Sequence, residues 1–287
     1  MDHKKAVTIR EMRPADLAFA ESCTAGEGWL SEDRTVLEGF FAKEIHGCLL
    51  AEENLQPIGV CIATRYGKSG FIGELIVHPE ARGKGVGAAL LNHGVSVLKA
   101  GGVETIYLDG VLSAVDLYER NGFRKICRSW RYSGHLTGEA SPHVRRMVVN
   151  DLAQVSTLDL HAFGEDRSFY LKRRLELFPK LSFVMVDRER ITGYILGREG
   201  VNWLSAGPWV VSESVENPMD LLHAFALEAH GRSISLGVLD TNREACELVQ
   251  VAGFIAREDS PWRMALGPAC DLGASPNCLA IGSAAKG

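Results

Sequence analysis

The chain lacks an apolar run long enough to cross a membrane. No stretch approaches the roughly 18 consecutive apolar residues that a spanning helix needs. The first residues, Met1 to Lys5, are polar, and no apolar core of signal-peptide length follows them. The formal net charge of −5 provides no broad basic surface for nucleic acid or anionic lipid. We therefore expect a cytoplasmic protein that binds neither nucleic acid nor membranes.

Cysteine patterning is also absent. The seven cysteines are an odd number, include no C-x-x-C pair and have no nearby histidine at ligand spacing. These absences argue against a disulfide framework and against a zinc site. We expect no metal, and we interpret each cysteine as a small buried apolar residue.

The chain does contain enough sequence for two domains, and it repeats itself. It has 287 residues, of which 46% are hydrophobic. The stretch 8–17 returns at 143–152 with matching Arg, Met, Asp and Leu residues, and the stretch 108–123 returns in part at 239–254. A period this long is typical of domain duplication and not of a repeat array. We predict two copies of one α/β domain.

The predicted boundaries follow from the repeat and from composition. We place the first domain at 1–137, a linker at 138–146 and the second domain at 147–267. The linker begins with Gly-Glu-Ala-Ser-Pro, a composition typical of loops. Residues 268–287 are rich in Ala, Gly and Ser, and we expect them to form a flexible tail.

A glycine-rich turn within residues 74–90 is the most informative stretch. A β-branched run ends just before Pro79, and helical spacing of apolar residues begins after Gly87. The turn therefore lies at a helix N-terminus, where unpaired amides and the positive end of the helix dipole favour a phosphate. We expect contacts with a phosphate-containing ligand from Arg82, Gly83, Lys84, Gly85, Val86, Gly87 and Ala88.

Two other phosphate-binding patterns compete for this turn. Residues 83–88 satisfy the dinucleotide pattern G-x-G-x-x-G/A, and Asp109 lies where a ribose-binding acid would follow. In a dinucleotide fold the first glycine directly follows the strand, whereas residues 78–82 intervene here. A P-loop requires G-K-[ST], which is absent. The remaining pattern is Arg-x-x-Gly-x-Gly on a strand, a loop and a helix.

This turn resembles the acetyl-coenzyme A loop of the GNAT superfamily of N-acetyltransferases. Residues 117–123, Leu-Tyr-Glu-Arg-Asn-Gly-Phe, look like the family's L-Y-E-x-x-G-F signature. Residues 159–167 look like the D-x-x-A-F-G-x-D-R segment of a subgroup with a second, degenerate GNAT-like domain. The resemblance covers residues from about 7 to 267. It implies an α/β fold of the α+β type, with tandem mixed and mostly antiparallel sheets flanked by helices.

The second copy has diverged at the turn. Its corresponding stretch, 207–219, has no glycine in the turn and has Glu213 and Glu216 where the first copy has cations. Such a surface would repel a pyrophosphate. Val249 also replaces Tyr118. We expect cofactor binding and catalysis in the first copy alone.

The resemblance implies transfer of acetyl from acetyl-CoA to a primary amine of a small molecule, by direct attack in a ternary complex. The backbone of Leu75, Ile76 and Val77 would hold the pantetheine arm and polarise the thioester carbonyl. Tyr118 would protonate the departing thiolate, with a packed aromatic as the alternative role. Glu74 is the candidate base, because an amine with a pKa near about 10 must lose a proton; its alternative is a salt-bridged carboxylate.

Four residues are candidates for the acceptor side. Asp109 is a rival base, with turn capping as its alternative. Trp29, Asp166 and Arg167 would line the acceptor pocket or pack between the domains. His78 lies at the strand end and is more often structural there.

Two other functions stay open at this point. The acceptor could be a protein N-terminus or lysine, which would need an open groove. The chain could also bind acetyl-CoA as a sensor without turnover, although Tyr118 beside an intact turn argues against this. We expect either a monomer or a homodimer.

Overall fold

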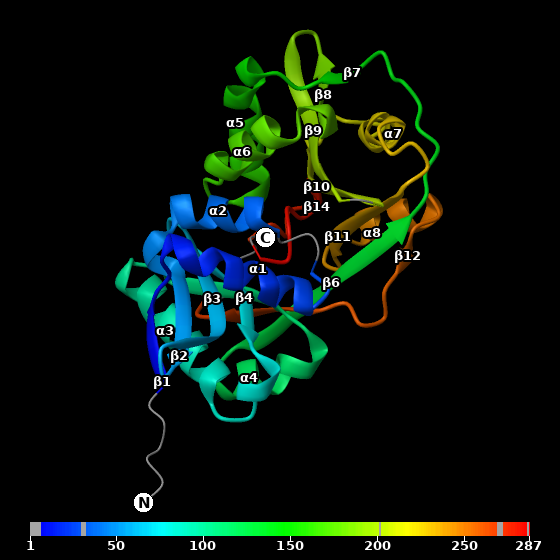
Figure 1. Cartoon of the computed structure of the whole chain (residues 1–287). Helices are drawn as coiled ribbons and strands as arrows, with labels where there is room; N and C mark the ends of the chain where they lie inside the picture. The colour runs from blue at the N-terminus through cyan, green and yellow to red at the C-terminus, as the bar shows by residue number, and fades with distance from the viewer. Residues whose placement is uncertain (1–6, 30–32, 201, 269–271, 286) are drawn as a thin grey trace, which may run out of the picture.

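The computed structural model describes residues 7–29, 33–200, 202–268, 272–285 and 287. Two α/β halves lie side by side and share one continuous strand order, β1-β2-β3-β4-β5-β13-β6-β11-β10-β9-β8-β7 (Figure 1). Each half is a mixed sheet with helices on both faces, which confirms the predicted fold class. In the described part of the chain, no helix is long and apolar enough to span a membrane.

The first half contains five strands of the first copy. Neighbouring strands are antiparallel except for β4 and β5, which are parallel. Helices α1 and α2 pack on one face of this sheet, and α3 and α4 pack on the other. The strands are β1 (Val7–Glu11), β2 (Cys48–Glu53), β3 (Gln56–Tyr66), β4 (Ser69–Val77) and β5 (Thr105–Gly110), and the helices are α1 (Leu17–Gly26), α2 (Arg34–Lys43), α3 (Val86–Ala100) and α4 (Val115–Arg120).

The second half repeats this plan. Its strands β10 and β11 are parallel, and its other neighbours are antiparallel. Helices α5 and α6 pack on one face, and α7 and α8 pack on the other. The strands are β7 (Val144–Arg146), β8 (Ser182–Asp187), β9 (Arg190–Glu199), β10 (Trp203–Val211) and β11 (Ser233–Leu239), and the helices are α5 (Leu152–Phe163), α6 (Ser168–Leu177), α7 (Met219–Leu227) and α8 (Arg243–Val251).

The repeat predicted from residues 8–17 and 143–152 is visible as one local structure built twice. Asp16 accepts from the backbone N–H of Arg13 and pairs with Arg10. Asp151 accepts from the N–H of Val148 and pairs with Arg145 in the same way. Each aspartate thus fixes the turn between the first strand and the first helix of its half.

The two halves exchange strands, which corrects the predicted boundaries. Strand β6 (Arg124–Gly134) starts in the first sheet, but residues 129–134 pair with β11, and two of them also pair with β12 (Ile255–Ala256). Strand β13 (Trp262–Leu266) returns from the second copy and lies between β5 and β6. Because these pairings join residues far apart in sequence, local patterns did not predict them.

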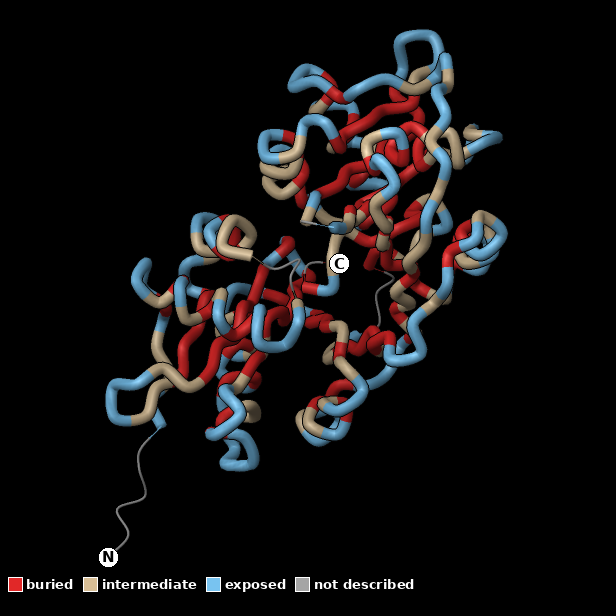
Figure 2. The backbone as a smooth tube through the Cα atoms, turned by 45° about the vertical axis from the view of Figure 1, so that its right-hand side comes forward, coloured by how far each residue is buried: buried red, intermediate tan, exposed pale blue. Residues whose placement is uncertain are grey.

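Two further boundaries are corrected. The predicted linker 138–146 contains β7, which is the edge strand of the second sheet. The predicted flexible tail is ordered wherever it is described; residues 269–271 and 286 lie outside the described part of the chain. Strand β14 (Cys278–Ala280) pairs with β10, and Leu279, Ile281 and Ala285 are buried. The tail's last residues lie between the two halves, among other buried segments (Figure 2).

Candidate functional site

The glycine-rich turn follows the end of β4 and begins α3. Gly83 and Gly85 both have left-handed φ angles, of 75° and 85°. A Cβ atom added at either glycine would meet no other atom within 4 Å, so the turn faces open space. Among the described residues, no backbone acceptor pairs with the N–H groups of residues 83–88. These amides, at the positive end of a 15-residue helix, can bind an anion.

The strands beside the turn part from one another. Strands β4 and β5 pair only where residues 69–71 face residues 105–107. Beyond this point β4 contains a bulge, because Ile62 faces Gly73 but Val60 faces Ile76. Glu74 lies in this bulge with φ +47°. Beyond residue 71, β4 therefore has no pairing with β5 along the edge that faces it, although its other edge still pairs with β3. This unpaired edge of β4 leads to the glycine-rich turn.

Tyr118 lies on the α3 side of this gap. It extends from α4 into the apolar cluster beneath α3, and its ring packs edge-on against Phe123 at 6.1 Å. A side chain on Gly110 of β5 would lie 2.9 Å from this ring, so the two are in close contact. Burial, with a smaller contribution from Cys61, raises the pKa of the Tyr118 hydroxyl. The hydroxyl therefore stays protonated at neutral pH, as a proton donor must.

The other predicted residues of β4 take the faces that strand alternation predicts. Leu75 and Val77 pack toward α3, whereas Ile76 packs toward α1 and α2. Glu74 is only 3% exposed. Burial, with smaller contributions from Cys48 and Glu74, raises the pKa of the Cys61 thiol, so the Glu74 carboxylate lies near Cys61. The use of Glu74 as the base stays a prediction.

Arg82 and Lys84 differ in how far they are engaged. The Arg82 guanidinium donates to the carbonyl of Val77 at 2.8 Å and pairs with Glu27, so it ties the turn to β4 and to the end of α1. Lys84 is exposed on the turn. Lys84 is thus the cation of the pair that can move freely toward a phosphate.

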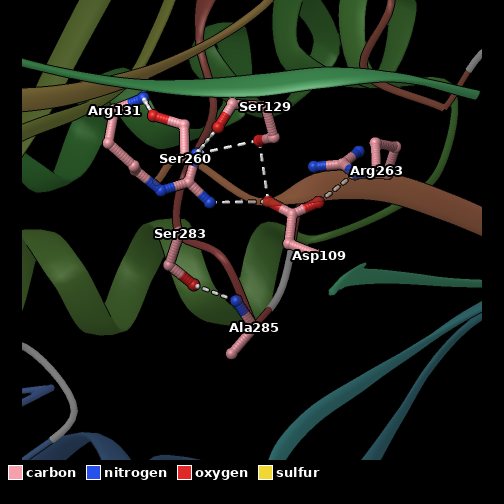
Figure 3. Close-up of polar contacts among 7 residues, drawn as sticks. All are labelled: Asp109, Ser129, Arg131, Ser260, Arg263, Ser283 and Ala285. Atoms are coloured by element: carbon pink, nitrogen blue, oxygen red, sulfur yellow. Dashed lines mark hydrogen bonds and ion pairs between the residues drawn. The ribbon is translucent and has the colours of Figure 1, made fainter. Parts of the chain in front are cut away.

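Asp109 is not positioned to act as a base. Its side chain is fully buried, and its Oδ1 accepts from Arg263 Nε at 2.5 Å. Its Oδ2 accepts from Arg131 at 2.6 Å and from the Ser129 hydroxyl at 2.8 Å (Figure 3). Burial alone would raise the pKa of the Asp109 carboxyl, but the two arginines outweigh burial and lower it. The predicted role as a rival base is therefore wrong.

Arg167 and Asp166, two other acceptor-side candidates, bond to residues of the second copy. Arg167 is buried, pairs with Asp159 and donates to the carbonyl oxygen of Gly287 at 3.0 Å. Asp166 accepts from the N–H of Ser168, where α6 begins. These contacts do not distinguish lining of the acceptor pocket from packing between the domains, and both roles stay predictions.

Trp29 is the fourth acceptor-side candidate, and it remains near the site. It is half-buried against the cluster under α1 and α2, which also contains Ile76 of β4. Glu165 was not among the candidates. Its carboxylate accepts hydrogen bonds from the backbone N–H groups of Lys68 and Ser69 in the first half. The motif 159–167 therefore joins the halves at the hairpin before β4.

The second half has a corresponding gap, but the chain itself fills it. Strands β10 and β11 pair at residues 203–206 and 233–236 and then part. Strand β14 enters there, with Trp209 facing Ala280. The N–H of Ile281 donates to the carbonyl of Gly237 on β11 at 2.9 Å. Sequence reasoning missed this occupation because β14 lies in the segment interpreted as a tail.

Sequence reasoning also missed Arg131 and Arg263, both of which bind Asp109. A signal was present for Arg263, because it is the one charged residue in the otherwise apolar run of β13. A charge at an inward position of a strand indicates a buried partner.

Two family profiles match the chain, one in each half. The Acetyltransferase (GNAT) family profile matches residues 14–123, and an Acetyltransferase (GNAT) domain profile matches residues 155–273. An uncharacterised protein of Caenorhabditis elegans is 26% identical over 177 residues. That match spans 56% of this chain and 56% of the relative.

Solved structures share the fold over more than nine tenths of the chain. A putative acetyltransferase from Pyrococcus horikoshii is 22% identical with a TM-score of 0.82, and the match covers 100% of this chain and 99% of that one. A tandem GNAT protein from the clavulanic acid biosynthesis pathway is 13% identical with a TM-score of 0.65, covering 92% and 100% of the two chains. A GCN5-related N-acetyltransferase from Sphaerobacter thermophilus is 20% identical with a TM-score of 0.66, covering 93% and 98%.

Proposed function

Because the chain belongs to the GNAT acetyltransferase family and carries two GNAT domains, we propose that its first half transfers an acetyl group from acetyl-CoA to a primary amine of a small molecule. The single observation that carries this proposal is the contrast between the two gaps. The gap between β4 and β5 adjoins six unpaired amides, whereas β14 fills the gap between β10 and β11.

The residues of the first half fit acetyl-CoA. The amides of residues 83–88 would bind its diphosphate, with Lys84 as a mobile counter-charge. The freed backbone of β4 at Leu75 to Val77 would bond the amides of the pantetheine arm, in place of the strand pairing that β5 no longer provides. Acetyl-CoA supplies the activated acetyl group as a thioester.

The transfer needs one base and one acid. Glu74 takes a proton from the ammonium form of the acceptor, and the neutral nitrogen attacks the thioester carbonyl. A C–N bond forms and the C–S bond breaks. The Tyr118 hydroxyl, which stays protonated because burial raises its pKa, gives its proton to the leaving sulfur. The tyrosinate then regains a proton as the amide product loses one.

Acceptor size favours a small molecule over a protein chain. Ala285 of the C-terminal segment packs directly on Gly73 of β4, where an added Cβ would lie 2.7 Å from the Ala285 Cβ. Gly287 packs beside Phe71 of the same strand. The segment thus covers part of the face of β4 that an extended peptide would need.

A thiol-release assay over a panel of small amines tests the proposal. We expect amine-dependent release by the wild-type protein and a large loss of rate in Tyr118→Phe with cofactor affinity retained. Tight cofactor binding without release for any amine would support the sensor alternative instead. Faster release with a peptide amine than with all small amines would support a protein acceptor.

A further inference from the structure

A charged cluster lies on the face of the first sheet opposite α3. Ile72, Ile106 and Leu108 point toward α3, so by strand alternation Phe71 and Asp109 point to the opposite face. Arg263 of β13 faces Asp109 in the strand register and lies on the same side. Asp109 lies two residues beyond the last pairing of β5 with β4, so the cluster lies beside the parted stretch, on the face away from Tyr118.

The cluster carries more positive than negative charge. Arg131 and Arg263 share the single carboxylate of Asp109. Within the described chain, neither arginine pairs with a second acid. Arg263 is 2% exposed. A net positive charge held this far from water is costly unless an anion balances it.

Arg263 has hydrogen-bonding capacity left over. Its Nε donates to Asp109, but its two terminal nitrogens are buried and have no hydrogen-bond partner among the described residues. The guanidinium carbon lies 5.0 Å from the centre of the Phe71 ring. By contrast, Arg131 directs its terminal nitrogens to Asp109 and Ser129. Two free terminal nitrogens present the fork that binds a carboxylate with two parallel bonds.

The C-terminal segment borders this cluster. A Cβ added at Gly237 of β11 would lie 2.8 Å from Ile281 and 2.9 Å from Arg131 Nη1, so the segment passes beside Arg131, and Ala285 contacts Gly73 of β4. The cluster, the parted strand and the segment therefore meet on one face of the first sheet. We propose that this place is the acceptor subsite and that Arg263 binds a carboxylate of the acceptor, so that the substrate is a small amino acid with a free primary amine. This inference rests on the proposed function.

Matched pairs of ligands test the inference. We would compare ω-amino acids of two to four carbons with their carboxamides, which keep the amine and lose the charge. Binding is measured by thermal stabilisation in the presence of coenzyme A, and turnover by thiol release. We expect the acids to bind wild-type protein roughly tenfold or more tighter than the amides, and Arg263→Gln to erase that difference.

Arg131→Gln is the matched control, because it removes the same charge from the same carboxylate. It should keep the preference for acids over amides. Should Arg263→Gln fail to fold, the pair Asp109→Asn with Arg263→Gln removes both charges together and must also erase the preference.

Four outcomes separate the inference from the proposed function. Equal binding of acids and amides by the wild-type protein overturns the inference, and so does a preference that survives loss of Arg263. Release of thiol with amides as readily as with acids overturns the inference while the proposed function stands. Selective binding of acids without thiol release for any amine refutes the proposed function and leaves the anion site intact.

Discussion

The two halves share one sheet topology, and each sheet contains a pair of parallel strands that part. In the first half, the parted stretch of β4 and β5 adjoins a turn with open amides. In the second half, β14 takes the place between β10 and β11. The comparison teaches that one sheet plan allows two different neighbours for a parted strand, which are open amides in the first half and a strand of the same chain in the second. Exposed strand backbone must be paired, and here the chain supplies its own strand.

The helices that follow β4 and β10 also differ, in the residues of their first turns. Helix α3 starts after a left-handed glycine and has no acid in its first turn. Helix α7 starts after Pro218, has nine residues and carries Asp220 in its first turn. An acid there already satisfies the helix dipole, so an anionic ligand gains little. The residues at the two helix starts therefore favour an anion beside α3 over one beside α7.

The largest effect is expected when an acidic residue, like those in the second copy, is placed in the glycine-rich turn of the first. Gly85→Glu should weaken coenzyme A binding by at least about 100-fold, because it adds a negative charge among the amides and strains a left-handed position. Isothermal titration measures the affinity. Gly85→Asn tolerates the same backbone and should retain most binding, and Ser214→Glu in the second turn should change nothing. Equal losses from Gly85→Glu and Ser214→Glu would remove the asymmetry.

Catalysis offers the next test of the same contrast. Tyr118→Phe should lower kcat by about 100-fold with the cofactor affinity unchanged, because the thiolate loses its proton donor. Burial raises the pKa of Tyr118, so the rate should show no loss from deprotonation of this donor up to pH ~9. Val249→Tyr, at the matching position of the second half, should leave kcat unchanged. A fall in the pH–rate profile that vanishes in Tyr118→Phe would contradict the raised pKa.

The stability of the second half should depend on the strand that fills its gap. Leu279 beside β10 is 6% exposed, so Leu279→Ala should lower the free energy of unfolding by about 2–4 kcal/mol. Val251, at 90% exposure on α8, is the matched control, and Val251→Ala should cost almost nothing. Urea unfolding measures both values. If Leu279→Ala lowers the free energy of unfolding no more than Val251→Ala does, then β14 does not stabilise the second half.

The smallest effect is expected where the halves agree. Asp16 and Asp151 fix equivalent turns, and in each case the hydrogen bond from the paired arginine is the main cause of a lowered carboxyl pKa. Because the folded pKa is lowered, the stabilisation is present above the unfolded value of about 3.9 and is lost as pH falls below it. Asp16→Asn and Asp151→Asn should each cost about 1 kcal/mol at pH 7 and less at pH 3. A cost that stays constant with pH would show that charge plays no part.

Local features were the ones that the sequence could predict. The glycine turn at residues 83–88 and the repeated stretches 8–17 and 143–152 both rest on local residue patterns, and the structure has the turn and the same aspartate contacts in both stretches. Asp109 was misjudged because a residue type at a strand end does not reveal that Arg131 and Arg263 will surround it. The exchange of β6 and β13 and the path of β14 depend on contacts between distant parts of the chain, for which a single sequence carries no local signal.

The exchange of β6 and β13 has a consequence for biosynthesis. As the chain leaves the ribosome, the first sheet has β5 and the start of β6 but lacks the strand between them until residues 262–266 emerge. The first half therefore cannot complete its sheet until most of the second copy has been synthesised. A gene fragment that encodes one GNAT domain alone would therefore yield a sheet with an unfilled place and an edge open to aggregation.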